Sequence, residues 1–381
     1  MQFSLSEEQL AISKAALQFA QNRLAPGYLA RDRSGVFSKN MTREMGALGF
    51  IAPEQSAEFG GAETSYLTSG LVMQAIAAAD FNMAYVQLLG SLNSQILAKY
   101  AGTDLAKKWI PKICAGEAVL GVALTEPGGG SDAANLQLKA VAVEGGYELS
   151  GEKASISMAD QADIMIVFAR TGEVSSRAKG VSAFLVEMDA GGVTTSRYDD
   201  MGQRCIGRGS IFFDRVFVAD DHRLGDENRA FSQVMEGFDF SRALIGLQCL
   251  AVAEQSLTET WRYVQEREAF GKPISVNQGV TFPLAEAQTH LEAAKLLCFK
   301  TLWLKDEGLP HTTEAAMCKW WGPKLAFDIV QQCLLLHGHG GYGRDYPFEQ
   351  RLRDLLGLQI GDGTAQIMKM VIARQKLEEN R

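Results

Sequence analysis

The sequence has few of the features that mark metalloproteins and membrane proteins. Only five of its 381 residues are histidines, and the one close pair, His337 and His339, has no cysteine or acidic ligand set nearby. Because metal sites are built from several such ligands, we expect no bound metal. No apolar run approaches the ~20 residues that cross a bilayer, and the N-terminus lacks the basic and apolar regions of a signal peptide. We therefore expect a soluble chain without a membrane span.

Disulfide bonds and nucleic-acid binding are also not indicated. The six cysteines are scattered without a C-x-x-C pair, and a chain that is 46% apolar can bury a large core without disulfide bonds. The formal net charge of -8 gives no general attraction for polyanions, and we find no local basic cluster that would offset it. The composition predicts a globular protein of two or three domains in a reducing cytoplasm.

Hydrophobic spacing divides the chain into three regions. Residues 1–118 have helical periodicity, which starts after a predicted N-cap at Ser6 with its capping-box partner Gln9. Residues 119–222 change to short β-branched and aromatic runs, and residues 223–381 return to long amphipathic helical patterns. We predict a multi-domain α+β protein: an N-terminal helical domain, a small middle β-barrel or sandwich, and a C-terminal four-helix bundle.

The middle region carries the strand signals. Alternation before and after Gly145 and Gly146 predicts a hairpin with its turn at the two glycines. Further strands are expected over residues 164–169, 181–188 and 211–218. Regular alternation of strands with helices is missing, which argues against a nucleotide-binding parallel sheet.

A glycine-rich segment, LTEPGGGSD at 124–132, lies where the helical region meets the β region. Three consecutive glycines let backbone N–H groups approach an anion, and Thr125 and Ser131 add hydroxyls. A phosphate or a flavin edge fits such a loop. A flexible turn capped by Ser131 and Asp132 fits it equally well.

Three further segments have both a structural and a functional interpretation. GHGGYG at 338–343 resembles a dinucleotide fingerprint only superficially, because it follows a predicted helix over 325–336 and not a strand. Two interpretations of this segment stay open: a connection between helices, or close backbone contact with a ligand or another subunit. Residues 267–274 predict a helix end with Gly271 as C-cap, although Arg267 is also able to clamp a pyrophosphate. In IGDGTAQ at 360–366, Asp362 or Thr364 suits an N-cap, and a carboxylate at such a turn also suits a general base.

These segments, in this order and on this background, resemble the acyl-CoA dehydrogenase family over essentially the whole chain. The match covers LTEPG through Ser131-Asp132, Arg267 to Gly271 with Gln278, and the closing stretch 351–366. The resemblance implies bound FAD, a coenzyme A thioester as substrate, electron-transferring flavoprotein or a similar acceptor as partner, and a homotetramer built as a dimer of dimers.

The resemblance also assigns roles to residues. It places one group against the flavin and its phosphates: Leu124, Thr125, Gly130, Ser131, Ser155, Ser157, Thr364 and Gln366. A second group completes the FAD site of a neighbouring subunit: Arg267, Phe270, Ile274 and Gln278. A third group lines the path of the substrate: Ser131, Phe238, Asp239, Arg242 and Gly361.

Asp362 occupies the position of the family's catalytic base. The implied reaction removes the proton α to the thioester carbonyl while the β-hydrogen leaves as hydride to flavin N5. Burial against substrate and flavin is expected to raise the pKa of this carboxyl toward working pH.

Two positions depart from the family pattern. Most members carry glutamate where this chain has Asp362, and often an aromatic residue where it has Gly361, so the shorter base faces a wider cavity. This resembles dehydrogenases of ring carboxyl-CoA esters, and we expect a cyclohexanecarboxyl-CoA-type or branched substrate. Ser155 stands in place of the flavin-stacking tryptophan, which leaves one flavin face less covered and changes the surface offered to the electron acceptor.

Two rival functions remain on the sequence alone. A nitroalkane-oxidase-like or acyl-CoA-oxidase-like flavoprotein uses the same fold, but Asp239 and Arg242 favour coenzyme A. A non-catalytic flavin-binding or DNA-associated scaffold is disfavoured by the acidity of the chain and by the carboxylate at position 362.

Overall fold

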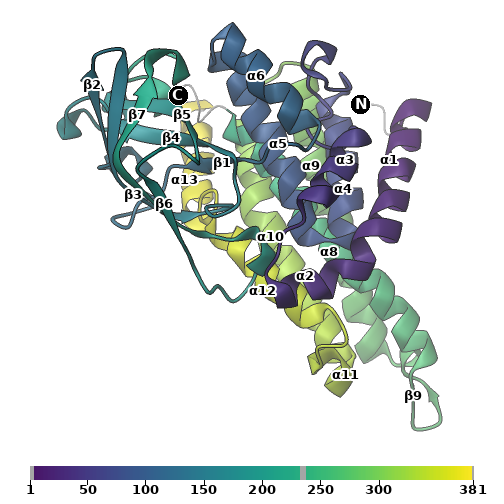
Figure 1. Cartoon of the computed structure of the whole chain (residues 1–381). Coiled ribbons are helices and arrows are strands. Elements are labelled where there is room, and N and C mark those ends of the chain that lie inside the picture. The colour runs from purple at the N-terminus through teal and green to yellow at the C-terminus, as the bar shows by residue number, and fades with distance from the viewer. Residues whose placement is uncertain (1–3, 232–236, 380–381) are drawn as a thin grey trace.

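The computed structural model describes residues 4–231 and 237–379. It has an N-terminal group of helices, a middle β-sheet and a long C-terminal bundle, as Figure 1 shows. The predicted class of fold is therefore confirmed. The predicted capping box is present at the first helix, where Ser6 accepts from the Gln9 N–H and the Gln9 side chain accepts from the Ser6 N–H. The N-terminal helices are α1 Glu7–Phe19, α2 Tyr28–Ser34, α3 Lys39–Ala47, α4 Tyr66–Ala79, α5 Phe81–Tyr100 and α6 Thr103–Cys114.

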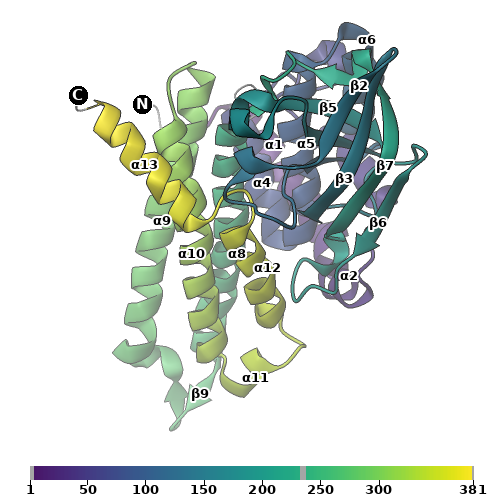
Figure 2. The ribbon, with the colours of Figure 1, turned by 90° about the vertical axis from the view of Figure 1, so that its left-hand side faces the viewer.

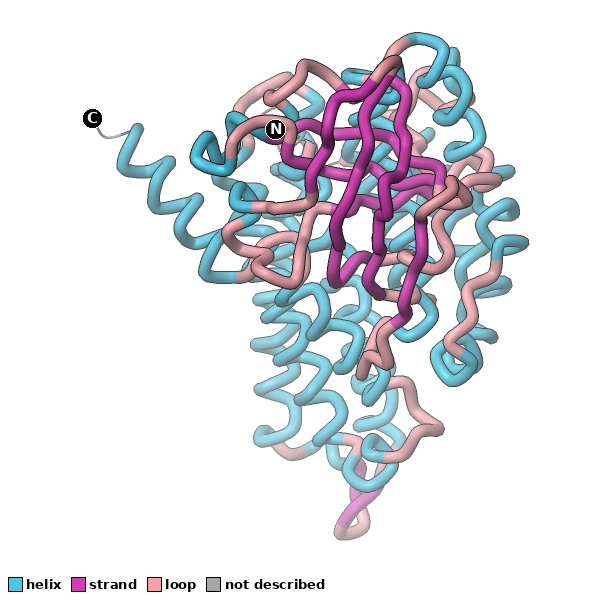
Figure 3. The backbone as a smooth tube through the Cα atoms, turned by 60° about the vertical axis from the view of Figure 1, so that its left-hand side comes forward, coloured by secondary structure: helices cyan, strands magenta, loops and turns pink. Residues whose placement is uncertain are grey.

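The middle region forms one eight-stranded sheet among the described residues, in the order β6-β7-β3-β2-β4-β5-β8, with β1 added in parallel to β4. All of β4 and all of β5 except its last residue are buried, as expected for strands that are covered on both faces. Figure 3 shows the strands together on one side of the helices. The strands are β1 Leu120–Ala123, β2 Lys139–Val143, β3 Gly146–Ile156, β4 Ile164–Arg170, β5 Val181–Glu187, β6 Val193–Arg197, β7 Gly209–Ala219 and β8 Arg223–Leu224.

Details of the sheet differ from expectation. The predicted hairpin is present, but Gly146 already pairs with Val143, so the turn consists of Glu144 and Gly145. Gly145 has a φ of +76°, which glycine adopts at little cost. The sheet also extends through β8 to Leu224, two residues beyond the predicted end of the middle domain.

The C-terminal region packs long helices side by side (Figure 2). Helices α8 and α10 approach each other closely at Gly246 and Gly322, where an added Cβ on Gly322 would lie 2.9 Å from the Gly246 Cα. Such a contact excludes even a methyl group, so the two backbones touch. The helices are α8 Phe238–Glu266, α9 Gln278–Asp306, α10 Thr312–Leu336, α11 Gly338–Tyr342, α12 Phe348–Ile360 and α13 Ala365–Glu379.

Buried polar contacts hold α12 against the other two regions. Asp354 accepts hydrogen bonds from Tyr28 Oη at 3.0 Å, from Asn82 Nδ2 at 3.1 Å and from the Gln203 N–H at 2.5 Å. Burial raises the pKa of the Asp354 carboxyl to about 7. Arg351 reaches α8, where it pairs with Glu259 at 2.6 Å. The Arg351–Asp354 part of the closing motif therefore positions α12.

The structure also answers three questions raised by the composition: the state of the cysteines, membrane-spanning helices and metal-ligand groups. All six cysteines are buried and unpaired. Within residues 4–231 and 237–379, no helix has the length and apolarity needed to span a membrane, and no group of three or more histidine, cysteine or acidic side chains is placed to hold a metal ion.

Candidate active site

The glycine-rich loop follows β1 directly and lies beside β3. The Ala154 N–H donates to the Thr125 carbonyl at 2.9 Å, which joins the loop to the strand. Gly128 and Gly129 are exposed, and no atom lies within 4 Å of the point where either would carry a Cβ. Their outer side is therefore open, as a loop that receives a bulky ligand requires.

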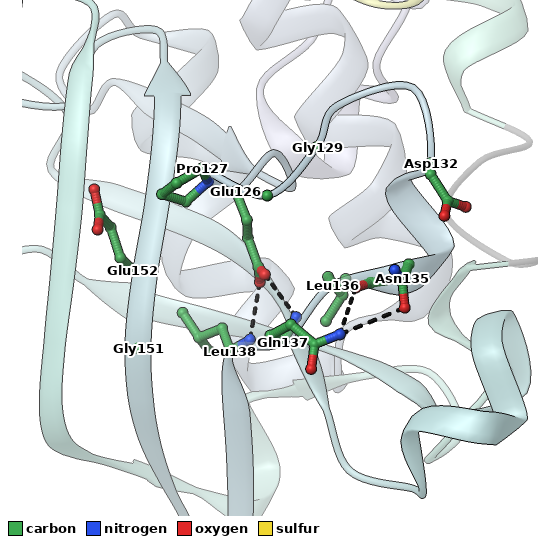
Figure 4. A pocket seen from close by; sticks show the side chains of 11 residues that line it. Glu126, Pro127, Gly129, Asp132, Asn135, Leu136, Gln137, Leu138, Gly151 and Glu152 are labelled. Carbon is green, nitrogen blue, oxygen red and sulfur yellow. Dashed lines mark hydrogen bonds between the residues drawn. The ribbon is translucent and has the colours of Figure 1, made fainter.

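Glu126 holds this loop from inside. Its carboxylate accepts from the Gln137 and Leu138 N–H groups at 2.6 and 2.9 Å and from Lys153 Nζ at 2.8 Å, and Figure 4 shows it turned toward the first two. Lys153, which is fully buried, also donates to the Leu124 carbonyl at 3.0 Å. Sequence reasoning missed both side chains, because their contacts join residues 27 and 29 positions apart.

A cavity of about 320 Å³ lies beside Glu126, between the loop and the start of β2. Its lining includes Pro127, Asp132, Gln137 and Glu152, but neither Ser131 nor Asp362. We therefore do not assign it to the reaction. Because Glu126 is paired internally, it presents no free negative charge to a phosphate at the loop.

The end of β3 presents two hydroxyl side chains next to the loop. The pairing of β3 with β7 is irregular between Lys153 and Ile156, and Ser155 has a φ of +59°. Ser155 is exposed and Ser157 half-buried, while Ile156 between them points into the core. The open glycines and these hydroxyls form one surface that suits a flavin and its phosphates, so the residues present fit FAD.

The second predicted group lies elsewhere in the same chain. The prediction that Gly271 caps a helix is wrong: α8 ends at Glu266, and β9 (Glu268–Ala269) pairs with β10 (Lys272–Pro273) in a hairpin. Phe270 and Gly271 form its turn with φ of +54° and +76°, as a two-residue hairpin of type I′ requires. The hairpin lies at the end of the bundle opposite the sheet (Figures 1 and 2).

The segment at the start of α8 brings its predicted residues together. Arg242 donates to Asp239 at 2.6 Å, and the other carboxylate oxygen of Asp239 accepts from Thr312 Oγ1 at 2.5 Å. Phe238 is buried beside them. Arg242 is also buried, and its Nε has no acceptor among the described residues. A buried donor without a partner is costly, and it suits an anionic or carbonyl group of a ligand.

Asp362 lies in the short loop between α12 and α13. Its φ is +54°, an uncommon value for a residue with a side chain, and Gly363 follows at +94°. Thr364 and not Asp362 is the N-cap of α13, since its hydroxyl accepts from the Ile367 N–H at 3.4 Å. Gln366 is exposed on the first turn. The Asp362 side chain therefore does not cap α13.

The surroundings of Asp362 shift its ionisation. Asp362 is exposed at the surface of the single chain, but the protein atoms around its carboxyl still desolvate it and raise its pKa, and the positive charges of Lys319 and Arg242 offset part of that rise. Lys319, on α10, is 1% exposed and was not predicted from the sequence. A carboxylate with a raised pKa and two cationic neighbours has the character of a general base.

The comparisons with known proteins agree along the chain. Three family models match: the acyl-CoA dehydrogenase N-terminal domain at residues 6–117, the middle domain at 121–216 and the C-terminal domain at 228–377. Benzylmalonyl-CoA dehydrogenase of Aromatoleum aromaticum is 32% identical, over 98% of this chain and 99% of its own length. Caffeyl-CoA reductase-Etf complex subunit CarC of Acetobacterium woodii is 31% identical, with the same coverage.

A solved structure supports the same relationship. Butyryl-CoA dehydrogenase from Megasphaera elsdenii has a TM-score of 0.95 and 30% identity, over 99% of this chain and all of that chain. The fold and its flavin-compatible surface define an FAD-dependent oxidoreductase. The chain belongs to the acyl-CoA dehydrogenase family, whose cofactor is FAD.

Proposed function

We propose that this protein removes two hydrogens from the α and β carbons of a coenzyme A thioester, with Asp362 as the base. FAD, when bound, accepts the β-hydrogen as a hydride. The observation that carries the proposal is the left-handed turn that presents the Asp362 carboxylate, with its raised pKa, near Arg242 and Lys319. The Leu124–Ser131 loop, Ser155, Ser157, Thr364 and Gln366 would hold the cofactor.

The substrate requires help from the protein because the α-proton of a thioester is too weakly acidic for a carboxylate alone. Negative charge that develops on the thioester oxygen must meet hydrogen-bond donors. The Asp362 N–H has no acceptor among the described residues and is available for this role. Arg242, whose Nε has no acceptor in the described part of the chain, would contribute along the coenzyme A path with Phe238, Asp239 and Ser131.

The acyl group is proposed to be bulky: alicyclic, as in the oxidation of cyclohexanecarboxyl-CoA to cyclohex-1-ene-1-carboxyl-CoA, or branched. Gly361 adds no side chain beside the base, and an added Cβ there would meet only the Gly357 carbonyl, at 3.4 Å. Asp362 is also one methylene shorter than glutamate, which leaves more space in front of it. The similarity to benzylmalonyl-CoA dehydrogenase supports a large acyl group.

We further propose a homotetramer in which Arg267, Phe270, Ile274 and Gln278 complete the FAD site of a neighbouring subunit. The Phe270 ring is fully exposed at the hairpin tip, and an aromatic ring in that position is typical of an interface. Helix α13 also extends away from the body (Figures 2 and 3) with only Met368 buried. The proposed domains are 1–118, 119–222 and 223–381.

The proposed electron acceptor is electron-transferring flavoprotein, supported by the similarity to a subunit of an Etf complex. Ser155 in place of a bulky aromatic residue would leave the flavin accessible from that side. We also propose a cytoplasmic location, which the six unpaired cysteines support.

Anaerobic bleaching of the flavin tests the reaction. Cyclohexanecarboxyl-CoA should bleach it faster than butyryl-CoA or octanoyl-CoA. The variant Asp362→Asn should retain flavin but lose reduction by roughly 100- to 10,000-fold, the usual contribution of a general base. Asp345→Asn, at an exposed position, is the control. Normal reduction in Asp362→Asn contradicts the base assignment, and oxygen consumption with nitroethane but not with acyl-CoA favours a nitroalkane oxidase.

A further inference from the structure

Lys319 ties together the two ends of the loop that carries Asp362. Its Nζ donates to the Leu358 carbonyl at 2.7 Å and to the Gly363 carbonyl at 3.0 Å. Leu358 lies in the last turn of α12, where carbonyl groups have no partner within the helix. Gly363 lies just before α13. One ammonium group on a third helix therefore joins the end of α12 to the start of α13.

The loop between these anchors needs such support. Asp362 and Gly363 both have positive φ, and a residue with a side chain keeps that conformation only where the surroundings hold it. The Gly361 N–H donates to the Gly357 carbonyl, which fixes only the start of the loop. In the described ranges, no group donates a hydrogen bond to the Asp362 carboxylate. The position of that carboxylate therefore depends on its backbone.

The charge on Lys319 also acts on Asp362. The other charged and titratable groups that interact with this pair come from two helices: Arg242 and Cys249 on α8, and Tyr85 on α5. Burial lowers the pKa of the Lys319 ammonium to about 8, an effect that Asp362 opposes. The same ammonium stabilises the ionised form of Asp362, because it lowers the pKa of that carboxyl.

We propose that Lys319 is a positioning residue for the base: its ammonium fixes the backbone on both sides of Asp362 and places a positive charge at the loop that carries the carboxylate. This inference rests on the proposed role of Asp362. Lys319 itself is not expected to contact the substrate. Replacing Lys319 should therefore change the rate of proton removal and the pH dependence of that rate more than the binding of acyl-CoA.

Two substitutions separate the geometric and electrostatic effects. In Lys319→Met both carbonyls lose their donor, and a misplaced base should lower the rate of anaerobic flavin reduction by roughly 10- to 100-fold, with KM changed by less than about threefold. The acid limb of the pH–rate profile should also move to higher pH, since the pKa of Asp362 rises when a nearby cation is lost. Lys319→Arg keeps the charge and should keep the position of that limb.

The alkaline limb provides a second readout. As pH rises past about 8, native Lys319 loses its proton and its charge, so its two hydrogen bonds to the loop carbonyls are no longer charge-assisted and the reduction rate should fall. Lys319→Arg should lack this fall because a guanidinium stays protonated. Lys324→Met is the matched control: it is on the same helix, exposed, and paired with Asp328 at 2.5 Å. It should match the unmodified protein in both limbs.

The outcomes distinguish this inference from the proposed function. Lys319→Met with unchanged rate and pH limbs, alongside an inactive Asp362→Asn, overturns the role of Lys319 and leaves the base in place. An active Asp362→Asn overturns the base and the inference together. If Lys319→Met does not fold, Lys319→Gln replaces it and is judged by the same rate and acid limb.

Discussion

Two loops of this protein are each held by a buried lysine, yet the two lysines have different charge partners. Lys153 donates to the Leu124 carbonyl beside the glycine-rich loop, and Lys319 donates to the Leu358 and Gly363 carbonyls around the Asp362 loop. Burial lowers the pKa of both ammonium groups to about 8. The first, however, forms an ion pair with Glu126 at 2.8 Å, whereas no carboxylate among the described residues lies within ion-pair distance of the second.

The difference separates support from chemistry. Glu126 balances the charge of Lys153 inside the protein, so that charge has little effect on a ligand at the loop surface. The charge of Lys319 instead lowers the pKa of the Asp362 carboxyl, whose ionisation matters for the proposed reaction. Both lysines therefore hold a loop, but only the charge of Lys319 is expected to influence the reactivity of a carboxylate in its loop. Three experiments test this comparison, from the largest expected effect to the smallest.

Glu126→Ala should affect folding most. It leaves Lys153 buried without its counter-ion and removes the acceptor of two backbone N–H groups. Breaking a buried pair in this way costs about 3–5 kcal/mol, which denaturant unfolding of the variant measures. Glu144→Ala, at the exposed hairpin turn, is the control. A loss of stability no larger than in the control means that the pair does not support the loop.

Gly363→Ala should disturb the Asp362 loop while Gly361→Ala should not. At Gly363 the φ is +94° and a new Cβ would lie 2.6 Å from the end of Met368, so we expect a loss of roughly 1 kcal/mol or more. At Gly361 the φ is −63° and the nearest atom is 3.4 Å away. Unfolding and flavin reduction, measured on both variants, should differ. Equal behaviour of the two contradicts a loop held in one conformation.

Gly361→Tyr should have the smallest effect on folding and should change substrate preference. The backbone accepts a side chain at this position, and the ring would occupy space beside the base. Relative kcat/KM for cyclohexanecarboxyl-CoA against butyryl-CoA should fall by roughly 10- to 100-fold, typical of steric discrimination in an apolar pocket. An unchanged ratio would remove Gly361 from the explanation of substrate size.

Much of the architecture was predictable from the sequence because it depends on local periodicity. The strands over residues 164–170 and 209–219 carry long apolar or alternating patterns. In contrast, β6 (Val193–Arg197) was not predicted, because four of its five residues are exposed and it lies at the sheet edge with no hydrophobic alternation. The hairpin at Phe270 was missed because its left-handed turn begins with phenylalanine, where asparagine or glycine is the usual signal.

The site was predictable only in part for a related reason. Asp362 and the 124–132 loop stand in recognisable motifs, and these motifs suggest roles for them from the sequence alone. Lys319 stands alone in an apolar helical stretch, and its acceptors lie 39 and 44 residues further along the chain. Lys153 gives no signal either. Long-range contacts of single polar residues leave no periodic pattern in the sequence.

The contact between Gly246 and Gly322 has a consequence for the electrostatic field at the base. Arg242 lies one turn before Gly246 on α8, and Lys319 lies one turn before Gly322 on α10. The separation of the two cations is thus set where neither helix carries a side chain. A single methyl group there, a full helical turn from either charge, would push the helices apart and weaken the potential that the carboxylate experiences.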